Sequence, residues 1–148
     1  MTTERYYLPE GLPAPVPESD NLSKPYWDGL LQGVLRAQKC RSCGTWQWGP
    51  EWICHKCHSF DPEWVEIAGH GRIYSWTRIW HPTHRALTER GPYVVVVVEL
   101  AEAGGIRMIG NLLGDAHQPF EIGDAVEVVF EQHTDRPKPY ALAQWRKV

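Results

Sequence analysis

Two short runs, Cys40-Arg41-Ser42-Cys43-Gly44 and Cys54-His55-Lys56-Cys57, contain all four cysteines of this 148-residue chain. The Cys-x-x-Cys spacing lets two thiolates point at one atom, and two such turns supply the tetrahedral set of four sulfurs that Zn²⁺ favours. Gly44 follows the first pair, where the turn needs a residue that tolerates a positive φ. The sequence therefore predicts one zinc ion bound by Cys40, Cys43, Cys54 and Cys57.

Four sulfurs fill the coordination sphere of zinc, so we expect the metal to hold structure and to carry out no chemistry. Two alternatives are open on the residues alone: a thioredoxin-like redox pair and two disulfides. Residues 1–17 lack the apolar core of a secretory signal, which favours the reducing cytoplasm and hence metal binding. His55 and His58 are expected to be exposed loop residues and not ligands.

The composition is typical of a globular protein with one ordinary core. Charged residues make up 22% of the chain, and the formal net charge is −3. No apolar run is long enough to span a bilayer, so no membrane partner is expected. The acidic balance also argues against nucleic acid as a partner, because basic surface supplies most of the affinity for phosphates.

Residues 1–38 are predicted to form an extended arm followed by one amphipathic helix. Four prolines in the first 17 residues prevent a regular helix, so the arm is either disordered or laid over a surface. Ser23 is placed to cap a helix that has Pro25 in its first turn. An apolar face, which packs on its own domain or docks on another protein, consists of Tyr26, Trp27, Leu30, Leu31 and Val34.

Residues 39–68 are predicted to form the zinc hairpin, which carries Trp46, Trp48 and Trp52 between its two turns. So small a loop cannot bury three indoles by itself. Some of them must pack on the rest of this chain or on a second polypeptide. Gly69-His70-Gly71 is a hinge-like boundary to the next module.

Residues 69–148 have the pattern of strands separated by turns. Five strands are expected at residues 72–80, 93–101, 106–113, 125–131 and 140–146, which predicts a small barrel. The second strand contains Tyr93-Val-Val-Val-Val-Val98 and is apolar on both faces. Its outer face must be covered by the helix, the ribbon or a partner subunit.

No catalytic constellation is visible in the sequence, which has neither a Gly-x-Ser-x-Gly motif nor a phosphate-binding loop. The one cluster with chemical potential is Trp80-His81-Pro82-Thr83-His84-Arg85, after the first barrel strand. Histidine transfers protons near neutral pH, and arginine pairs with phosphates such as those of coenzyme A. The same residues also fit an exposed loop without a reactive role.

A set of short motifs is distributed over residues 25–148. They are Tyr26-Trp27-x-Gly29-Leu30, Cys40-x-x-Cys43-Gly44, Pro50, Cys54-x-x-Cys57, Gly69-x-Gly71-x-Ile73-Tyr74-Ser75, Pro92-Tyr93-Val94-Val95, Val98-Glu99-Leu100 and Ile122-Gly123-Asp124-x-Val126. In these motifs the chain resembles a known family of two-module proteins, with a rubredoxin-like zinc ribbon and an OB-fold, associated with acyl-CoA metabolism. The family is catalogued as domain of unknown function thirty-five.

The resemblance implies a mainly β protein with an N-terminal helix, a zinc ribbon and a five-stranded OB-fold barrel. It also implies an accessory subunit of a thiolase-superfamily aldolase or acyltransferase, such as the retro-aldolases that shorten steroid side chains. Such a subunit belongs to a hetero-oligomer, shares the acyl-CoA substrate and leaves catalysis mostly to the larger chain. The chain departs from the family pattern at Gly49, Glu51 and His55, which affects the surface that the ribbon presents.

Candidate contacts with the partner or with coenzyme A are Tyr26, Trp27, Trp48, Trp52, Trp80, His81, His84 and Arg85. Two other functions stay open. The histidine-containing loop also fits a stand-alone acyl-CoA-binding protein or enzyme. An OB-fold can instead bind single-stranded nucleic acid. Here the bases would stack on Tyr74, Trp76 and Trp80, with Arg72 and Arg78 as basic neighbours.

Overall fold

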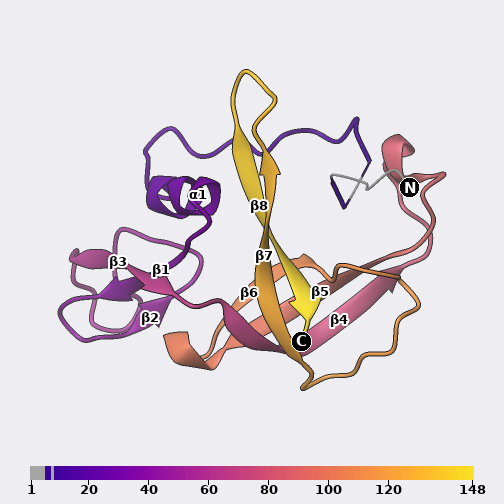
Figure 1. Cartoon of the computed structure of the whole chain (residues 1–148). Helices are drawn as coiled ribbons and strands as arrows, with labels where there is room; N and C mark the ends of the chain where they lie inside the picture. Colours follow the sequence, from indigo (N-terminus) through magenta and orange to yellow (C-terminus); the bar gives the residue numbers. More distant parts are fainter. Residues whose placement is uncertain (1–5, 8) are drawn as a thin grey trace.

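The chain folds into one helix, a small three-stranded sheet and a larger five-stranded sheet, seen in a computed structural model that describes residues 6–7 and 9–148 (Figure 1). The three-stranded sheet has the order β2-β1-β3, and the five-stranded sheet has the order β6-β5-β4-β7-β8. No helix in this part of the chain is long and apolar enough to cross a membrane. The elements are α1 (Lys24–Leu31), β1 (Leu35–Cys40), β2 (Trp46–Gln47), β3 (Pro62–Ile67), β4 (His70–Ile79), β5 (Tyr93–Leu100), β6 (Ile106–Asn111), β7 (Ala125–His133) and β8 (Tyr140–Lys147).

The five-stranded sheet curls into a nearly closed barrel. Its paired strands are all antiparallel. The two edges meet where Leu113 N–H donates to the Trp145 carbonyl at 2.7 Å, beside a bridge between Leu112 and Trp145. All five predicted strands form, with ends that differ from the prediction by no more than two residues. The predicted mainly β fold with an OB-fold barrel is confirmed.

Helix α1 begins where the sequence predicts, with Pro25 in its first turn, but it ends earlier than predicted. Ser23 occupies the N-cap position, but its hydroxyl donates to Glu18 Oε2 at 2.8 Å and makes no capping hydrogen bond. The predicted N-cap position of Ser23 is therefore confirmed, but its side chain bonds to Glu18 and not to the helix. The helix ends in a Schellman motif, in which Gly33 has a φ of 72° and Val34 N–H donates to Gly29 O at 2.8 Å. Val34 thus lies beyond the helix and not on its apolar face.

The helix, the ribbon and the barrel share one core. Leu30 of α1, Leu35 of β1 and Trp145 of β8 belong to the same buried cluster and are each at most 1% exposed. Gln132 Nε2 of β7 adds a hydrogen bond to Leu30 O at 2.9 Å. The apolar face of the helix therefore packs on its own chain, the first of the two predicted alternatives.

The three ribbon tryptophans differ in how far this chain covers them. Trp46 packs closely on the turn at Gly104. Trp48 makes an edge-to-face contact with Tyr26, with ring centroids 4.8 Å apart. Trp52 is 51% exposed. Two of the three indoles therefore find their neighbours within this chain.

The outer face of β5 stays partly open. Alternate valines of this strand are buried inside the barrel, while Val95 and Val97 on the other face are partly exposed. Ile109 of β6, paired with Val97, is 69% exposed. Helix α1 packs instead on β1, β7 and β8. Cover of this face by a partner subunit stays a prediction.

The junction between ribbon and barrel is fixed by Glu102. Its carboxylate accepts hydrogen bonds from three consecutive backbone N–H groups, those of Ala68, Gly69 and His70, at 3.1, 2.8 and 3.3 Å. Gly69 has a φ of 77°, and a Cβ there would lie 2.3 Å from Val128 Cγ1. The segment expected to be hinge-like is thus held in one conformation by a charged acceptor and by packing.

Replacing Glu102 by Ala should lower the free energy of unfolding by about 1 kcal/mol, because three donors lose a charged acceptor at a solvent-facing site. Urea denaturation followed by tryptophan fluorescence measures the change. Glu121→Ala, on the exposed loop before β7, is the control and should change stability by less than about 0.5 kcal/mol. Equal effects of the two variants would contradict the role of Glu102.

Gly104 and Gly105 offer a matched test of the contact between ribbon and barrel. Both have a positive φ, 67° and 78°, so alanine introduces backbone strain at either position. Only at Gly104 would the Cβ meet Trp46, at 2.7 Å from Cδ1. Gly104→Ala should therefore destabilise the protein by about 1 kcal/mol more than Gly105→Ala in thermal or urea unfolding. No difference would mean that Trp46 moves aside freely.

Candidate metal centre and exposed aromatic surfaces

Each Cys-x-x-Cys pair lies in a tight turn of the same geometry. Gly44 N–H donates to Cys40 O at 2.8 Å, and His58 N–H donates to Cys54 O at 3.0 Å. Both donors have a positive φ, 74° for Gly44 and 62° for His58. The glycine prediction is thus confirmed in the first turn, and a histidine adopts the same conformation in the second. The two turns direct their thiols to one point.

The four thiols form a compact cluster. All four Sγ atoms lie within 4.8 Å of one another, and the Cys40–Cys57 and Cys43–Cys54 pairs are each 3.6 Å apart. In a tetrahedral zinc site with Zn–S bonds of about 2.3 Å, neighbouring sulfurs are about 3.8 Å apart. The four cysteines are free of disulfides. Their chemistry and spacing therefore fit zinc.

Hydroxyl groups favour the thiolate form at Cys40 and Cys43, whereas desolvation and the neighbouring Cys40 and Cys43 thiols raise the pKa of Cys57. Ser59 Oγ lies 3.2 Å from the Sγ atoms of both Cys40 and Cys57, and its hydrogen bond lowers the pKa of Cys40 to about 6. Thr45 Oγ1 lies 3.1 Å from Cys43 Sγ and lowers the pKa of that thiol. A lowered thiol pKa favours metal binding near neutral pH, because fewer protons must be displaced from the ligands.

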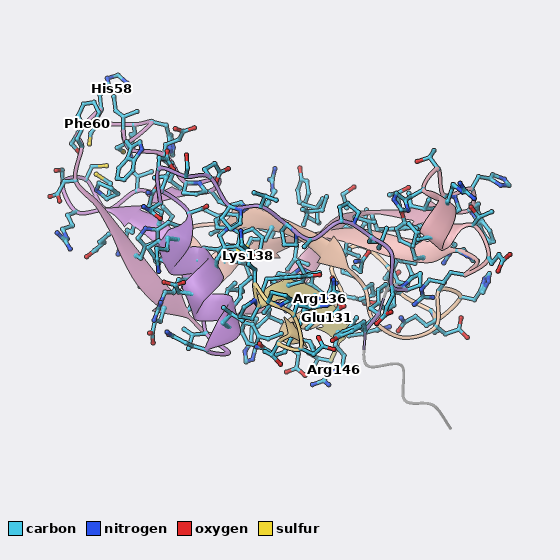
Figure 2. All side chains as sticks on the ribbon, turned by 90° about the horizontal axis from the view of Figure 1, so that it is seen from above. His58, Phe60, Glu131, Arg136, Lys138 and Arg146 are labelled. Carbon is cyan, nitrogen blue, oxygen red and sulfur yellow. The ribbon has the colours of Figure 1, made fainter. Side chains whose placement is uncertain are left out.

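Two buried glutamines stabilise the cysteine turns through hydrogen bonds. Gln47 Oε1 accepts a hydrogen bond from His55 N–H at 2.9 Å and lies 2.7 Å from His55 Nδ1. Gln47 Nε2 donates to Gln38 Oε1 at 3.1 Å. The His55 ring is therefore held by an amide and is not part of the cysteine cluster, while His58 lies at the exposed ribbon tip with Phe60 (Figure 2). Neither glutamine was predicted, because in the sequence each one is simply a polar residue on a short strand.

The predicted contact residues fall into two groups at opposite ends of the molecule (Figure 1). In the group beside the ribbon, the Tyr26 ring lies 5.3 Å from the Trp27 ring and 4.8 Å from the Trp48 ring. These three residues pack against the core and are partly buried, and burial raises the pKa of Tyr26 to about 12. Only Trp52 in this group is largely exposed.

The second group is the loop after β4, with the exposed residues Trp80, His81, His84 and Arg85. The Trp80 side chain is 54% exposed, and its ring lies 5.5 Å from the His117 ring. His84 Nδ1 accepts the Ala86 N–H at 3.2 Å and caps the short 3₁₀ turn at Arg85–Leu87. That contact gives His84 a local structural role.

An aromatic cluster around Arg78 extends the exposed surface next to Trp80. The guanidinium carbon of Arg78 lies 5.4 Å from the Trp76 ring and 5.7 Å from the rings of Trp80 and Phe120. Arg78 Nε donates to Ala116 O at 2.8 Å. The alternation Trp-x-Arg-x-Trp in the sequence hinted at this face, but the contribution of the 113–120 loop was missed. Surfaces rich in tryptophan and arginine are typical of protein interfaces.

The comparisons with known proteins agree with this architecture. Residues 27–63 match the family model of the ChsH2 rubredoxin-like zinc ribbon domain, and residues 64–131 match that of the ChsH2 C-terminal OB-fold domain. A DUF35 domain-containing scaffold protein of Methanothermobacter thermautotrophicus is 35% identical over 99 residues, which is 66% of this chain and 72% of that protein. The chain belongs to the DUF35 family. Its membership confirms the resemblance seen in the sequence.

Three further relatives place this DUF35 chain among proteins of different size. A solved structure described as "Ltp2-ChsH2(DUF35) aldolase" matches with a TM-score of 0.74 and 35% identity, over 90% of this chain and 98% of that chain. A probable enoyl-CoA hydratase alpha subunit of Thermomonospora curvata is 40% identical over 112 residues. This DUF35 chain spans 33% of that relative's length. A DUF35 protein of unknown function from Sulfolobus solfataricus, 16% identical with a TM-score of 0.62, shares the fold.

The zinc-ribbon match and the four converging thiols together confirm the predicted zinc cofactor. Cys40, Cys43, Cys54 and Cys57 would hold the ion. Bound zinc would fix the two turns to each other, and with four thiolate ligands it would offer no open coordination position.

Cys40→Ser should abolish stoichiometric zinc binding and unfold the ribbon, because thiolate coordination supplies much of the folding free energy of such modules. Elemental analysis of anaerobically purified protein and amide hydrogen exchange of residues 40–60 measure both effects. His55→Ala should keep one zinc ion per chain, since His55 bonds to Gln47 and not to the metal. A Cys40→Ser variant with full zinc content, or metal-free wild type, would contradict this assignment.

Proposed function

We propose that this chain is a non-catalytic but required subunit of a thiolase-superfamily aldolase, a carbon–carbon lyase, or of a related acyltransferase. The substrates would be acyl-CoA thioesters, with CoA esters of steroid side chains as one candidate class. One observation carries the proposal. The chain corresponds to nearly the whole length of the matched chain in a structure described as an Ltp2-ChsH2(DUF35) aldolase, at 35% identity.

The chemistry of the chain supports a docking role. Its metal ligands form a closed set of four thiols, which leaves no position for substrate activation. In the predicted histidine loop, the His84 ring caps the short 3₁₀ turn and so has a local structural role. Exposed aromatic side chains are concentrated instead on surfaces at the two ends of the molecule, where a partner can bury them.

We assign the partner contacts first to the most exposed members of each end. On the ribbon these are Trp52 and Phe60, which are 51% and 75% exposed. On the barrel they are Trp80, 54% exposed, with His81 and Arg85 beside it. Tyr26, Trp27 and Trp48 would contribute mainly by shaping the base of the ribbon surface, because they pack on the core. The reduced thiols that zinc requires favour a cytoplasmic location.

The carbon–carbon cleavage itself would belong to the larger partner. This chain would add binding surface, order the partner's substrate channel and keep the acyl-CoA in place. A subunit of this kind raises the population of the active arrangement without a reacting group of its own, since anything that binds only the folded, active form stabilises it.

The chain alone should show no turnover of acyl-CoA thioesters, whereas its mixture with a thiolase-like partner protein should cleave the substrate. Trp80→Ala should weaken the association by at least about tenfold, because a buried tryptophan at an interface contributes more than 1 kcal/mol. Calorimetric titration of the two purified subunits measures the affinity. Val148→Ala, a 79% exposed apolar side chain next to the end of β8, is the control and should bind normally.

Two results would count against this function. Turnover by the purified chain alone, lost in His81→Ala, would identify a stand-alone enzyme. Full activity of the larger protein in the absence of this chain would remove the need for an accessory subunit.

A further inference from the structure

The described part of the N-terminal arm, residues 6–7 and 9–17, forms a strap over the barrel, which is the second of the two predicted alternatives (Figure 1). Arg90 Nε, in the loop before β5, donates to Tyr7 O at 2.9 Å, and its guanidinium carbon lies 4.8 Å from the Tyr7 ring. The Tyr6 hydroxyl donates to Asp135 Oδ1 at 2.8 Å, at the β7–β8 turn. The strap is thus fastened at two points.

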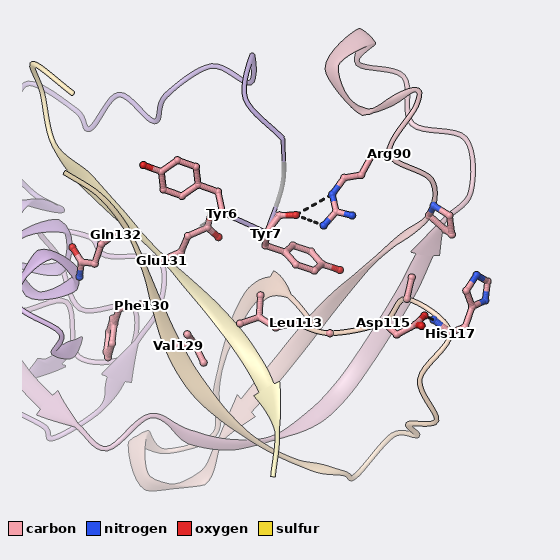
Figure 3. A pocket seen from close by; sticks show the side chains of 13 residues that line it. Tyr6, Tyr7, Arg90, Leu113, Asp115, His117, Val129, Phe130, Glu131 and Gln132 are labelled. Atoms are coloured by element: carbon pink, nitrogen blue, oxygen red, sulfur yellow. Dashed lines mark hydrogen bonds between the residues drawn. The ribbon is translucent and has the colours of Figure 1, made fainter. Parts of the chain in front are cut away.

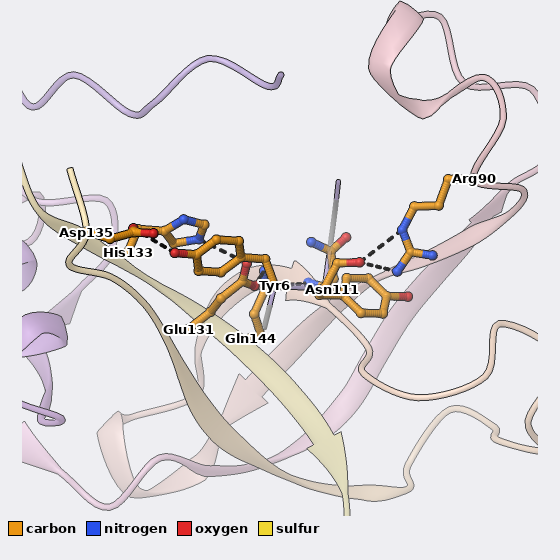
Figure 4. Close-up of polar contacts among 8 residues, drawn as sticks. Tyr6, Arg90, Asn111, Glu131, His133, Asp135 and Gln144 are labelled. Carbon is orange, nitrogen blue, oxygen red and sulfur yellow. Dashed lines mark hydrogen bonds and ion pairs between the residues drawn. The ribbon is translucent and has the colours of Figure 1, made fainter. Parts of the chain in front are cut away.

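The Tyr6 ring covers a buried histidine. It stacks on His133 with ring centroids 4.0 Å apart and planes 12° apart (Figure 4). The Tyr140 ring also stacks on His133, at 4.5 Å and 11°. Two rings that both stack on one imidazole must lie on its opposite faces. His133 is 5% exposed in this arrangement. Movement of Tyr6 would therefore uncover one face of the imidazole.

The covered histidine belongs to a polar network with one unused nitrogen. His133 Nε2 lies 3.0 Å from Glu131 Oε1, and Gln144 Nε2 donates to Glu131 Oε2 at 2.8 Å (Figure 4). Gln144 Oε1 in turn accepts the Asn111 N–H at 2.8 Å. Among the described residues, His133 Nδ1 is buried without a hydrogen-bond partner. A buried polar atom of this kind lowers stability unless a further group satisfies it.

Tyr6 also separates two cavities. The larger, of about 760 Å³, is lined by Tyr6, Arg90, Phe130 and Glu131 among others (Figure 3). The smaller, of about 130 Å³, lies between the strap and the β7–β8 hairpin, and His133 and Tyr140 line it. Tyr6 and Glu131 line both cavities. Outward movement of Tyr6 would join them into one groove of the size that small-molecule sites have.

We propose that this groove is a small-molecule site gated by Tyr6, and that its ligand is a planar ring with a hydroxyl group. Tyr6 itself shows which chemistry fits, because its ring stacks on His133 while its hydroxyl donates to Asp135. A ligand in its place would make both contacts. The site is separate from the metal centre, and its larger cavity reaches His117, whose ring lies 5.5 Å from that of Trp80.

The strap is built so that it can open. Pro9, Pro13, Pro15 and Pro17 remove backbone donors from it, and side chains supply the fastening contacts. Segments held in this way open locally at a smaller free-energy cost than global unfolding. Occupation of the site by Tyr6 lowers the apparent affinity for an external ligand in proportion to the closed population.

p-Cresol, the side chain of tyrosine as a free molecule, is the probe for this site. The Tyr6→Ala variant should bind it saturably at one site per chain, with shifts of the His133 ring signals in NMR spectra. Wild type should bind it at least about tenfold more weakly, because Tyr6 competes for the site. Asp135→Ala in the Tyr6→Ala background should weaken binding by about three- to tenfold, through loss of the hydroxyl acceptor.

Tyr74→Ala is the matched control, since Tyr74 is a 46% exposed tyrosine on β4 away from the groove, and this variant should behave as wild type. Tyr6→Phe keeps the ring, loses the bond to Asp135 and should bind p-cresol several-fold more tightly than wild type, which tests the gate without a large deletion. Three outcomes would overturn the site: no saturable binding by folded Tyr6→Ala, equal affinity in Tyr6→Phe and wild type, or binding that leaves the His133 signals unchanged.

Discussion

The carboxylate of Glu102 sets the arrangement on which the rest of the molecule depends. By accepting three consecutive backbone N–H groups between β3 and β4, it turns a glycine-containing joint into a fixed corner. The ribbon and the barrel also share a core that includes Leu35 and Trp145. The exposed aromatic residues at the ribbon tip and at the barrel end are therefore held at a constant separation. A partner that contacts both ends must match that separation, which favours selective recognition over adaptable binding.

The metal centre and the glutamine pair beneath it serve the same rigidity on a smaller scale. Zinc would join two turns that are separate in sequence, while Gln38 and Gln47 bind the backbone and His55 between them. The Ser59 and Thr45 hydroxyls favour thiolates and so bias the site towards metal at neutral pH. These contacts hold the two turns in place, and the exposed Trp52 is presented on a preformed base.

Local sequence patterns predicted the elements well, and contacts between distant residues account for what they missed. Cysteine spacing, strand alternation and turn glycines gave the ribbon, the five barrel strands and the φ of Gly44. Ser23 is the N-cap residue as predicted, but its hydroxyl bonds to Glu18 and not to the helix. Val34 was misplaced because a Schellman motif ends the helix earlier. Glu102 acts on backbone 32 to 34 residues away, which no local pattern reveals. In the sequence, Glu131 and His133 look like ordinary residues of an alternating strand. Only the structure shows that Tyr6 and Tyr140 stack on His133.

The strap connects surfaces that would otherwise be independent. Arg90, which holds Tyr7, lies in the same loop as Trp80, His84 and the 3₁₀ turn at Arg85–Leu87. On the other side, Tyr6 bonds to the β7–β8 turn, and β7 and β8 carry the residues on which α1 packs. A change in the strap would therefore reach both the barrel end proposed for docking and the helix beside the ribbon. Because the strap is held by the contacts of a few side chains, whereas the corner at Glu102 is also held by the core that the ribbon and the barrel share, we expect the strap to yield first when a ligand or partner binds.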